Sequence, residues 1–189
     1  MQNTVLTIVI LLVLVVLIVA APAIGTYNRL LPLDEGIDNA WAQAETVLQR
    51  RYDRVPSLVN LVKNYAEHEK SLLDEIERLR SQWAGAKITE DKARTASRLE
   101  EALSKLMTAS GDYADLKANE TFIALRDEFT AAETRISLER RRYNDAVRDY
   151  NTAFRRFPAK LFAGILGFRK RDVYLQTASD AKERSVVEF

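Results

Sequence analysis

The chain has 189 residues, and its 28 basic and 27 acidic side chains nearly cancel, leaving a formal net charge of +1. The absence of cysteine excludes disulfides, thiolate metal sites, cysteine nucleophiles and a lipid-modified cysteine. The near-zero charge argues against a global field that attracts nucleic acid, so we expect no nucleic-acid partner. Glycine and proline are scarce, whereas Ala, Leu, Glu, Arg and Lys are abundant. That composition favours an all-α fold with long helices.

Residues 5–24 form an apolar run that is interrupted only by Thr7 and Pro22. As a helix this run would extend about 30 Å, roughly the thickness of the hydrocarbon core of a bilayer. A cleaved signal peptide is the alternative, because small residues surround Pro22. However, no Lys or Arg precedes the run, and the run exceeds the usual apolar region of about 7 to 15 residues. We therefore predict a retained, single-pass transmembrane anchor over residues 1–26.

The charges that flank this anchor favour one orientation in the membrane. The N-terminal flank carries only the α-amine, whereas Arg29, Arg50 and Arg51 follow the run. The positive-inside rule therefore predicts a cell (inner) membrane protein with its C-terminal domain in the cytoplasm.

An apolar stripe follows a juxtamembrane stretch that contains Pro32, and we expect Asp34 to cap a new helix there. The stripe alternates spacings of four and three residues, the period of a coiled-coil or helical-bundle seam. Its members are Ile37, Trp41, Ala44, Leu48, Val55, Leu58, Val62, Tyr65, Leu72, Ile76, Leu79 and Trp83. Pro56 lies inside the stripe, which leaves either a kinked continuous helix or a break near Asp53. We favour the kink because the heptad phase continues through the proline.

Two further helices are predicted after Gly85, which should end the first long helical region. One is capped by Thr89 and ends at Gly111, with a buried face formed by Ala96, Leu99, Leu103, Leu106 and Met107. The other is capped by Asn119 and stopped by Pro158. Its stripe comprises Phe122, Leu125, Phe129, Ala132, Ile136, Tyr143, Val147, Tyr150, Phe154 and Phe157. Together these helices predict an antiparallel helical bundle over residues 27–168, followed by a polar tail over residues 169–189.

Polar residues occupy some of the seam positions that a heptad normally fills with apolar groups. Arg51, Glu69 and Glu139 are the examples. Their aliphatic stems could extend to the rim of the bundle and leave the charges in water. Alternatively, Arg50 and Arg51 pair with Glu133 or Glu139 across helices and fix the register of the bundle.

A segment near the C-terminus combines basic residues with an apolar centre. The bases are Arg155, Arg156, Lys160, Arg169, Lys170 and Arg171, and no acidic residue interrupts them. The apolar centre between them includes Leu161 and Phe162. Such a segment suits an anionic membrane surface, so these residues are predicted lipid contacts. The alternative is that the apolar centre caps one end of the bundle.

No catalytic or metal site is recognisable in the sequence. His68 is the only histidine, and the residues three and four positions away are Asn64, Tyr65, Ser71 and Leu72, none of them a strong metal ligand. There is no G-x-S-x-G motif and no glycine-rich phosphate loop. We therefore predict a protein without enzymatic activity, cofactor or bound metal.

Four stretches of the chain resemble signatures of the LemA family. They are YNRLL at residues 27–31, RRYDRVPSLVNLVKNYAEHEK at 50–70, DLKANETF at 115–122 and YNDAVRDYNTAFRRFPAKLFAGILGF at 143–168. The resemblance covers residues 27–168 and leaves the tail outside. It implies a bacterial membrane protein with an N-terminal transmembrane helix and a helical bundle, but no defined biochemical activity and no catalytic residues.

Two functional hypotheses follow. The leading one is a membrane-anchored scaffold that self-associates through the long seam, with lipid, further copies of itself and other membrane proteins as partners. The alternative is an accessory or signalling subunit of a membrane protein complex, linked to a protease or to envelope stress, in which Pro56 is a hinge.

Overall fold

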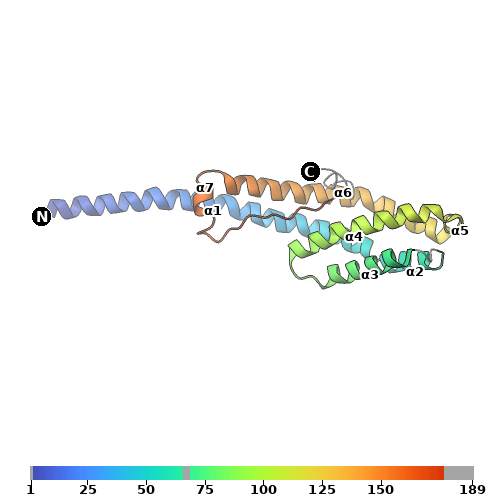
Figure 1. Ribbon diagram of the computed structural model, residues 1–189. Coiled ribbons are helices and arrows are strands. Elements are labelled where there is room, and N and C mark those ends of the chain that lie inside the picture. The colour runs from blue at the N-terminus through green and yellow to red at the C-terminus, as the bar shows by residue number, and fades with distance from the viewer. Residues whose placement is uncertain (1, 66–68, 177–189) are drawn as a thin grey trace, which may run out of the picture. The chain divides into compact units, whose positions relative to one another are not determined.

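The computed structural model describes residues 2–65 and 69–176, and all regular secondary structure in these ranges is helical (Figure 1). This confirms the predicted all-α fold with long helices. In chain order the elements are α1 (Gln2–Tyr52), α2 (Val55–Lys63), α3 (Lys70–Gly85), α4 (Thr89–Ala109), the 3-10 helix η2 (Ser110–Asp112), α5 (Ala114–Lys117), α6 (Glu120–Arg155) and α7 (Ala159–Phe162).

The chain divides into two compact units. Unit 1 comprises Met1–Asn39 and Asp145–Asp172, and unit 2 comprises Ala40–Asn144 and Val173–Phe189. Helices α1 and α6 each contribute residues to both units. The boundary predicted after residue 26 falls inside α1, which is uninterrupted there.

Helix α1 continues through Pro22 and Pro32, so the prediction that a new helix is capped by Asp34 is wrong. A proline in a helix interior loses one backbone hydrogen bond and clashes with the preceding turn, at about 3 kcal/mol. Burial on both sides of Pro32 offsets this cost, because Leu30 and Ile37 are 0% and 1% exposed. The packing of the apolar face therefore overrides the local preference of proline to end a helix.

Unit 1 contains an exposed apolar stretch followed by a small core. The large apolar side chains of α1 between residues 5 and 24 are each 50–62% exposed. The core begins directly after this stretch and consists of Thr26, Leu30, Ile37, Val147, Tyr150, Asn151, Ala153, Ala159 and Ala163. Helix α6 ends at Arg155, shortly before the predicted stop at Pro158.

Unit 2 holds the larger core, in which apolar faces of α1, α2, α3, α4 and α6 are buried. Tyr52 and Trp83 meet edge to face with their ring centroids 4.9 Å apart, and Trp41 and Tyr143 do so at 5.5 Å. Nearly the whole predicted seam is buried. The differences are Tyr65, which is exposed, and Leu72, whose place in the core Leu73 takes. The seam is thus largely covered by the chain's own helices.

The seam is not carried by one kinked helix, so the favoured interpretation of Pro56 is wrong. Helix α1 ends at Tyr52, and α2 begins at Val55 with Pro56 in its first turn. Proline fits there because its missing N–H is one that a first turn leaves unbonded anyway. The alternative of a break near Asp53 is the one that the structure shows. A hinge at Pro56 therefore loses its structural basis.

Several predicted helix ends are confirmed. Helix α3 ends at Gly85, and α4 begins at Thr89 as its first helical residue, although the cap position itself is held by Ile88. The side-chain Oδ1 of Asn119 accepts a hydrogen bond from the backbone N–H of Phe122 at 3.1 Å. This is the N-terminal capping bond predicted for α6.

Candidate functional site

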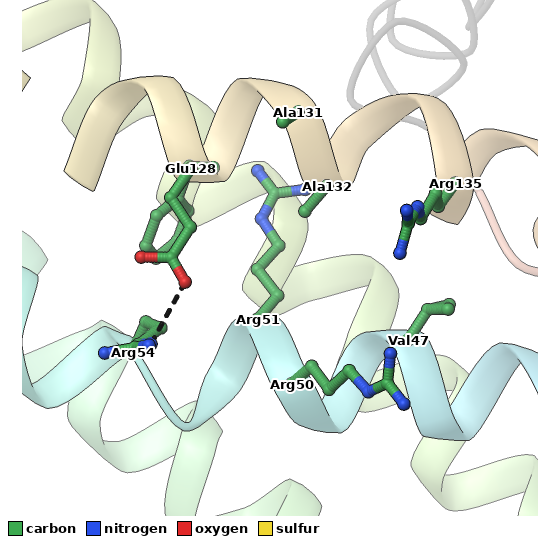
Figure 2. A pocket seen from close by; sticks show the side chains of 9 residues that line it. Val47, Arg50, Arg51, Arg54, Glu128, Ala131, Ala132 and Arg135 are labelled. Carbon is green, nitrogen blue, oxygen red and sulfur yellow. Dashed lines mark ion pairs between the residues drawn. The ribbon is translucent and has the colours of Figure 1, made fainter. Parts of the chain in front are cut away.

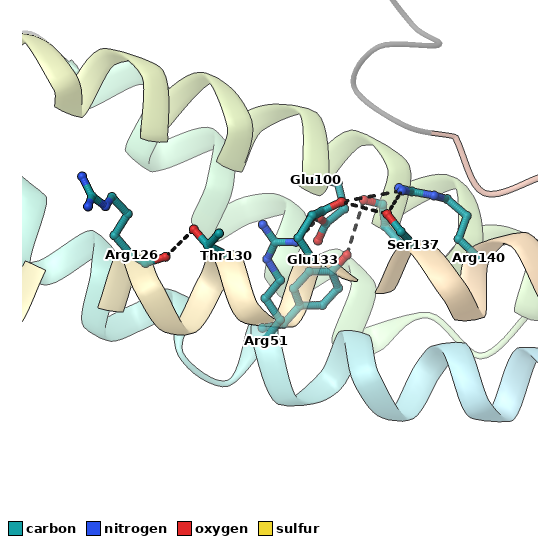
Figure 3. Close-up of polar contacts among 9 residues, drawn as sticks. Arg51, Glu100, Arg126, Thr130, Glu133, Ser137 and Arg140 are labelled. Carbon is teal, nitrogen blue, oxygen red and sulfur yellow. Dashed lines mark hydrogen bonds and ion pairs between the residues drawn. The ribbon is translucent and has the colours of Figure 1, made fainter. Parts of the chain in front are cut away.

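An ionic cluster formed by Arg51, Glu100, Glu133 and Arg140 lies in unit 2 (Figure 3). Arg51 Nη1 lies 2.7 Å from Glu100 Oε2 and 2.5 Å from Glu133 Oε2. Arg140 Nη2 lies 3.6 Å from Glu133 Oε1 and donates to Ser137 Oγ at 2.8 Å. The cluster therefore links the last turn of α1 to α4 and α6 through one arginine.

Burial makes this cluster energetically unusual. The side chains of Arg51 and Glu100 are each only 9% exposed, whereas Glu133 is 46% exposed. The guanidinium of Arg51 also lies 5.2 Å from the ring centroid of Phe129, a cation–π distance. Desolvating two charges costs several kcal/mol per ion, and the attraction between them recovers this only with good geometry. The cluster is therefore better suited to fixing the register of three helices than to adding stability.

Burial shifts the pKa of two side chains at the cluster. Burial raises the pKa of the Glu100 carboxyl above its ordinary value of 4.5, although nearby Arg51 partly opposes that shift. Burial, and then the Glu100 carboxylate, raise the pKa of Tyr52 well above 10.0. Tyr52 therefore stays protonated at neutral pH, and its hydroxyl donates a long hydrogen bond of 3.4 Å to Ala96 O.

The structure brings together only part of the predicted pairing set. It places Arg51 beside Glu133, but Glu139 pairs with Arg142 of its own helix at 2.9 Å. Arg50 is exposed and lies outside the ionic cluster.

Sequence reasoning missed Glu100, which it treated as part of a charged helix surface. The missed signal is its spacing: Glu100 follows Ala96 by four residues and precedes Leu103 by three. This spacing puts Glu100 on the buried face of α4.

Beside the cluster is a groove of about 350 Å³ (Figure 2). We call it the arginine groove, and it is lined by Val47, Arg50, Arg51, Arg54, Glu128, Phe129, Ala131, Ala132 and Arg135. Arg54 Nε pairs with Glu128 Oε1 at 3.1 Å across the groove, between residues that are about half exposed. The lining thus combines arginine side chains with apolar ones, and we call the apolar part, which is Val47, Phe129, Ala131 and Ala132, the floor.

In unit 1, most of the predicted lipid-contact residues are exposed, whereas Arg171 packs within the unit. Of the predicted apolar contacts, Leu161 is 61% exposed and Phe162 is half-buried. Phe157 and Ile165 are also exposed, at 81% and 84%, and we call Phe157, Leu161 and Ile165 the apolar patch. The prediction that Phe157 belongs to the apolar stripe of the last long helix is wrong, because α6 ends before it, at Arg155. The bases Arg155, Arg156, Lys160, Arg169 and Lys170 are exposed, and Lys170 pairs with Asp172.

Arg171 differs from these exposed bases, because its side chain packs within unit 1. Arg171 Nη2 lies 3.0 Å from Asp34 Oδ1 and 3.9 Å from Asp38 Oδ1. The predicted lipid-contact segment is therefore attached to α1 at its C-terminal end.

A repeated Tyr-Asn pair on α6 is a second feature that sequence reasoning missed. In unit 2, the Tyr143 hydroxyl donates to Val173 O at 3.2 Å. The Asn144 amide donates to Leu175 O at 2.9 Å and accepts from the N–H of Leu175 at 2.9 Å. Leu175 is 5% exposed. The side chains of α6 thus bind the backbone of an extended segment.

Unit 1 contains the same arrangement seven residues later. The Tyr150 hydroxyl donates to Arg169 O at 2.7 Å. The Asn151 amide donates to Arg171 O at 2.5 Å and accepts from the N–H of Arg171 at 3.1 Å. Seven residues are close to two helical turns, so both pairs lie on one face of α6. The first residues of the predicted polar tail are therefore packed by specific hydrogen bonds.

The model of the LemA family matches residues 40–189, which is most of the chain. The chain belongs to the LemA family. A search of curated proteins found no match. The family match includes residues 169–189, which the resemblance in the sequence had left outside.

Metal binding finds no support in the described part of this LemA-family chain. Within residues 2–65 and 69–176, no group of three or more His, Asp or Glu side chains could hold a metal ion. His68, which the sequence analysis set aside as a ligand, lies outside these residues.

Proposed function

We propose that this LemA-family protein is a membrane-anchored helical scaffold that acts by binding and not by catalysis. One observation carries the proposal. An 18-residue window near the start of α1 has a mean hydropathy of 3.3, and none of it is buried within the chain. Each Leu, Ile, Phe or Val at the centre of a membrane helix favours insertion by roughly 0.3–0.6 kcal/mol. A run of such residues favours a bilayer over water as the solvent of this helix.

The apolar patch supports a second membrane contact within unit 1. The rings of Tyr27 and Phe168 lie 5.7 Å apart, so the segment that bears the patch packs against α1 just after the apolar run. Tyr27 lies three residues after Ile24, which is about 4.5 Å along a helix axis. With the run in a bilayer, this part of α1 lies at the membrane interface. The exposed bases around the patch would there meet anionic headgroups, at about 1 kcal/mol each.

Self-association is also part of the proposal, although less of the apolar surface is free for it than the sequence suggested. The seam that suggested it is largely buried by the chain's own helices. The exposed apolar surfaces that remain on described residues are mainly in unit 1. We expect an oligomer by light scattering in mild detergent, and a sharp monomer at concentrations well above micromolar would contradict it.

The anchor is tested by flotation of the full chain with lipid vesicles under alkaline, high-salt conditions. A variant with Leu12→Arg and Val16→Arg places two charges in the apolar run, each costing about 2.5–3.5 kcal/mol at the helix centre. We expect the wild type to float and this variant to be released. Its matched control carries Ile88→Arg and Leu138→Arg, at exposed apolar positions of unit 2, and should float like the wild type. Release of the wild type, or mass spectrometry showing removal of the apolar run in cells, would contradict the anchor.

A further inference from the structure

The arginine groove contains cationic charge that the ionic cluster does not use. Arg51 is occupied by Glu100 and Glu133, and Arg54 by Glu128. Arg50 and Arg135 also line the groove, and neither forms an ion pair with any described residue. Two exposed guanidiniums thus lie on one groove and are available to an anion from outside.

The positions of these arginines are set by helices and not by loops. Arg50 is on the last turn of α1, and Arg135 is in the middle of α6. In Figure 2 the side chains of Arg50 and Arg135 extend over the same hollow, and Val47 lies between them. Ala132 lies beside the hollow. The ionic cluster holds α1 against α6 at this level through Arg51 and Glu133. The groove is therefore formed before any ligand arrives.

The floor of the groove limits what kind of anion fits it. Val47, Phe129, Ala131 and Ala132 supply the apolar part of the lining. A bare inorganic anion would satisfy the guanidiniums and leave this floor wet. A groove of about 350 Å³ is at the lower end of sizes that hold a small ligand or a few side chains. The fit is best for an apolar side chain flanked by carboxylates.

We propose that the arginine groove binds an acidic peptide segment of a partner protein, with carboxylates on Arg50 and Arg135 and an apolar side chain on the floor between them. Guanidiniums accept carboxylates through paired, charge-assisted hydrogen bonds, which gives both affinity and orientation. The buried Arg51, stacked near Phe129, forms a rigid wall of the site. This inference rests on the proposed binding role of the protein but not on its membrane anchor.

The test uses the full chain in detergent and a fluorescein-labelled peptide of alternating Glu and Leu residues, with binding followed by fluorescence anisotropy. We expect saturable binding that weakens as salt is raised. The variant with Arg50→Gln and Arg135→Gln should bind roughly tenfold more weakly or worse, since it loses two charge-assisted contacts. The matched control carries Arg94→Gln and Arg98→Gln, exposed arginines on α4, and should bind like the wild type.

Two altered peptides and one competitor separate the possible results. A peptide with Gln for Glu should not bind, and one with Ser for Leu should bind clearly more weakly. The peptide assignment would be overturned in favour of a general anion site if the Ser peptide bound as well as the Leu peptide. The same conclusion would follow if millimolar inorganic phosphate displaced the labelled peptide as effectively as unlabelled peptide does. Unchanged binding by the groove variant, or no binding by the wild type, would overturn the site itself. Vesicle flotation of the same samples reports separately on the anchor.

Discussion

The two units of this chain depart from the usual distribution of side chains in opposite directions. Unit 1 exposes apolar residues, both along the start of α1 and in the apolar patch. Unit 2 encloses charge, because Arg51 and Glu100 are each 9% exposed, and Arg51 also lines a groove with further arginines. Exposed apolar surface indicates contact with lipid or protein, whereas buried paired charge indicates a requirement for one specific alignment. This contrast is the basis on which we propose membrane contact for unit 1 and partner recognition for unit 2.

The largest effect that would sharpen this comparison is expected from removing the central cation of unit 2. Arg51→Met leaves the Glu100 carboxylate buried without its cation, and breaking a buried ion pair costs about 3 kcal/mol or more. Thermal unfolding of the full chain in detergent, followed by circular dichroism, measures this loss. Arg50→Met is the matched control, and its exposed side chain should cost little. Equal effects of the two changes would show that the cluster does not order unit 2.

A smaller loss of stability is expected when the asparagine of either Tyr-Asn pair is replaced. Asn151→Ala in unit 1 leaves the backbone N–H and carbonyl of Arg171 without these partners, and such losses cost about 1–3 kcal/mol when the groups are buried. Asn151 is 2% exposed, whereas Asn144 is only half-buried, so Asn144→Ala should cost less. Unfolding in detergent should therefore rank Asn151→Ala below Asn144→Ala in stability. The reverse order would mean that the segment is held mainly in unit 2.

Replacing Pro56 should change the stability of the protein in opposite directions under the two interpretations, a helix start and a kinked continuous helix. A proline that fits a first helical turn stabilises by restricting the unfolded chain, so Pro56→Ala should lower stability by about 0.4–1 kcal/mol. A proline inside a kinked helix would give the opposite result, a gain approaching 3 kcal/mol. Chemical denaturation of both proteins distinguishes these outcomes, and a gain would restore the hinge.

The smallest expected effect is a change in pH dependence at Glu100. Its pKa is raised in the folded chain, so the folded state binds more protons than the unfolded state just above pH 4.5. Stability contributed by this group is therefore present below that pH and is lost as the pH rises through the raised pKa. Because Gln cannot ionise, the difference in stability between Glu100→Gln and the wild type should shift in favour of the variant as the pH rises through the raised pKa. Parallel pH profiles for the two proteins would contradict the shift.

Much of the fold could be predicted because the signals were local and periodic. The apolar run, the Asn119 cap and the end of α3 at Gly85 each depend on a few neighbouring residues. The prolines were misjudged because their effect depends on packing: buried neighbours carry α1 through Pro32, while a turn before Val55 makes Pro56 a helix start. The ionic cluster and the groove could not be anticipated from one helix at a time, since the cluster joins α1, α4 and α6 and the groove is lined mainly by residues of α1 and α6.

The central claim, lipid contact at two places in unit 1 and none in unit 2, can be measured directly because the chain contains no cysteine. Single cysteines at Leu12, Leu161 and Ile88 would carry an environment-sensitive fluorophore in vesicles containing anionic and brominated lipids. These three positions are similarly exposed, at 62%, 61% and 58%. We expect strong quenching at Leu12, partial quenching at Leu161 that marks the interface, and none at Ile88. A label at Leu161 that behaves like the one at Ile88 would contradict the second membrane contact, and an unquenched label at Leu12 would contradict the anchor.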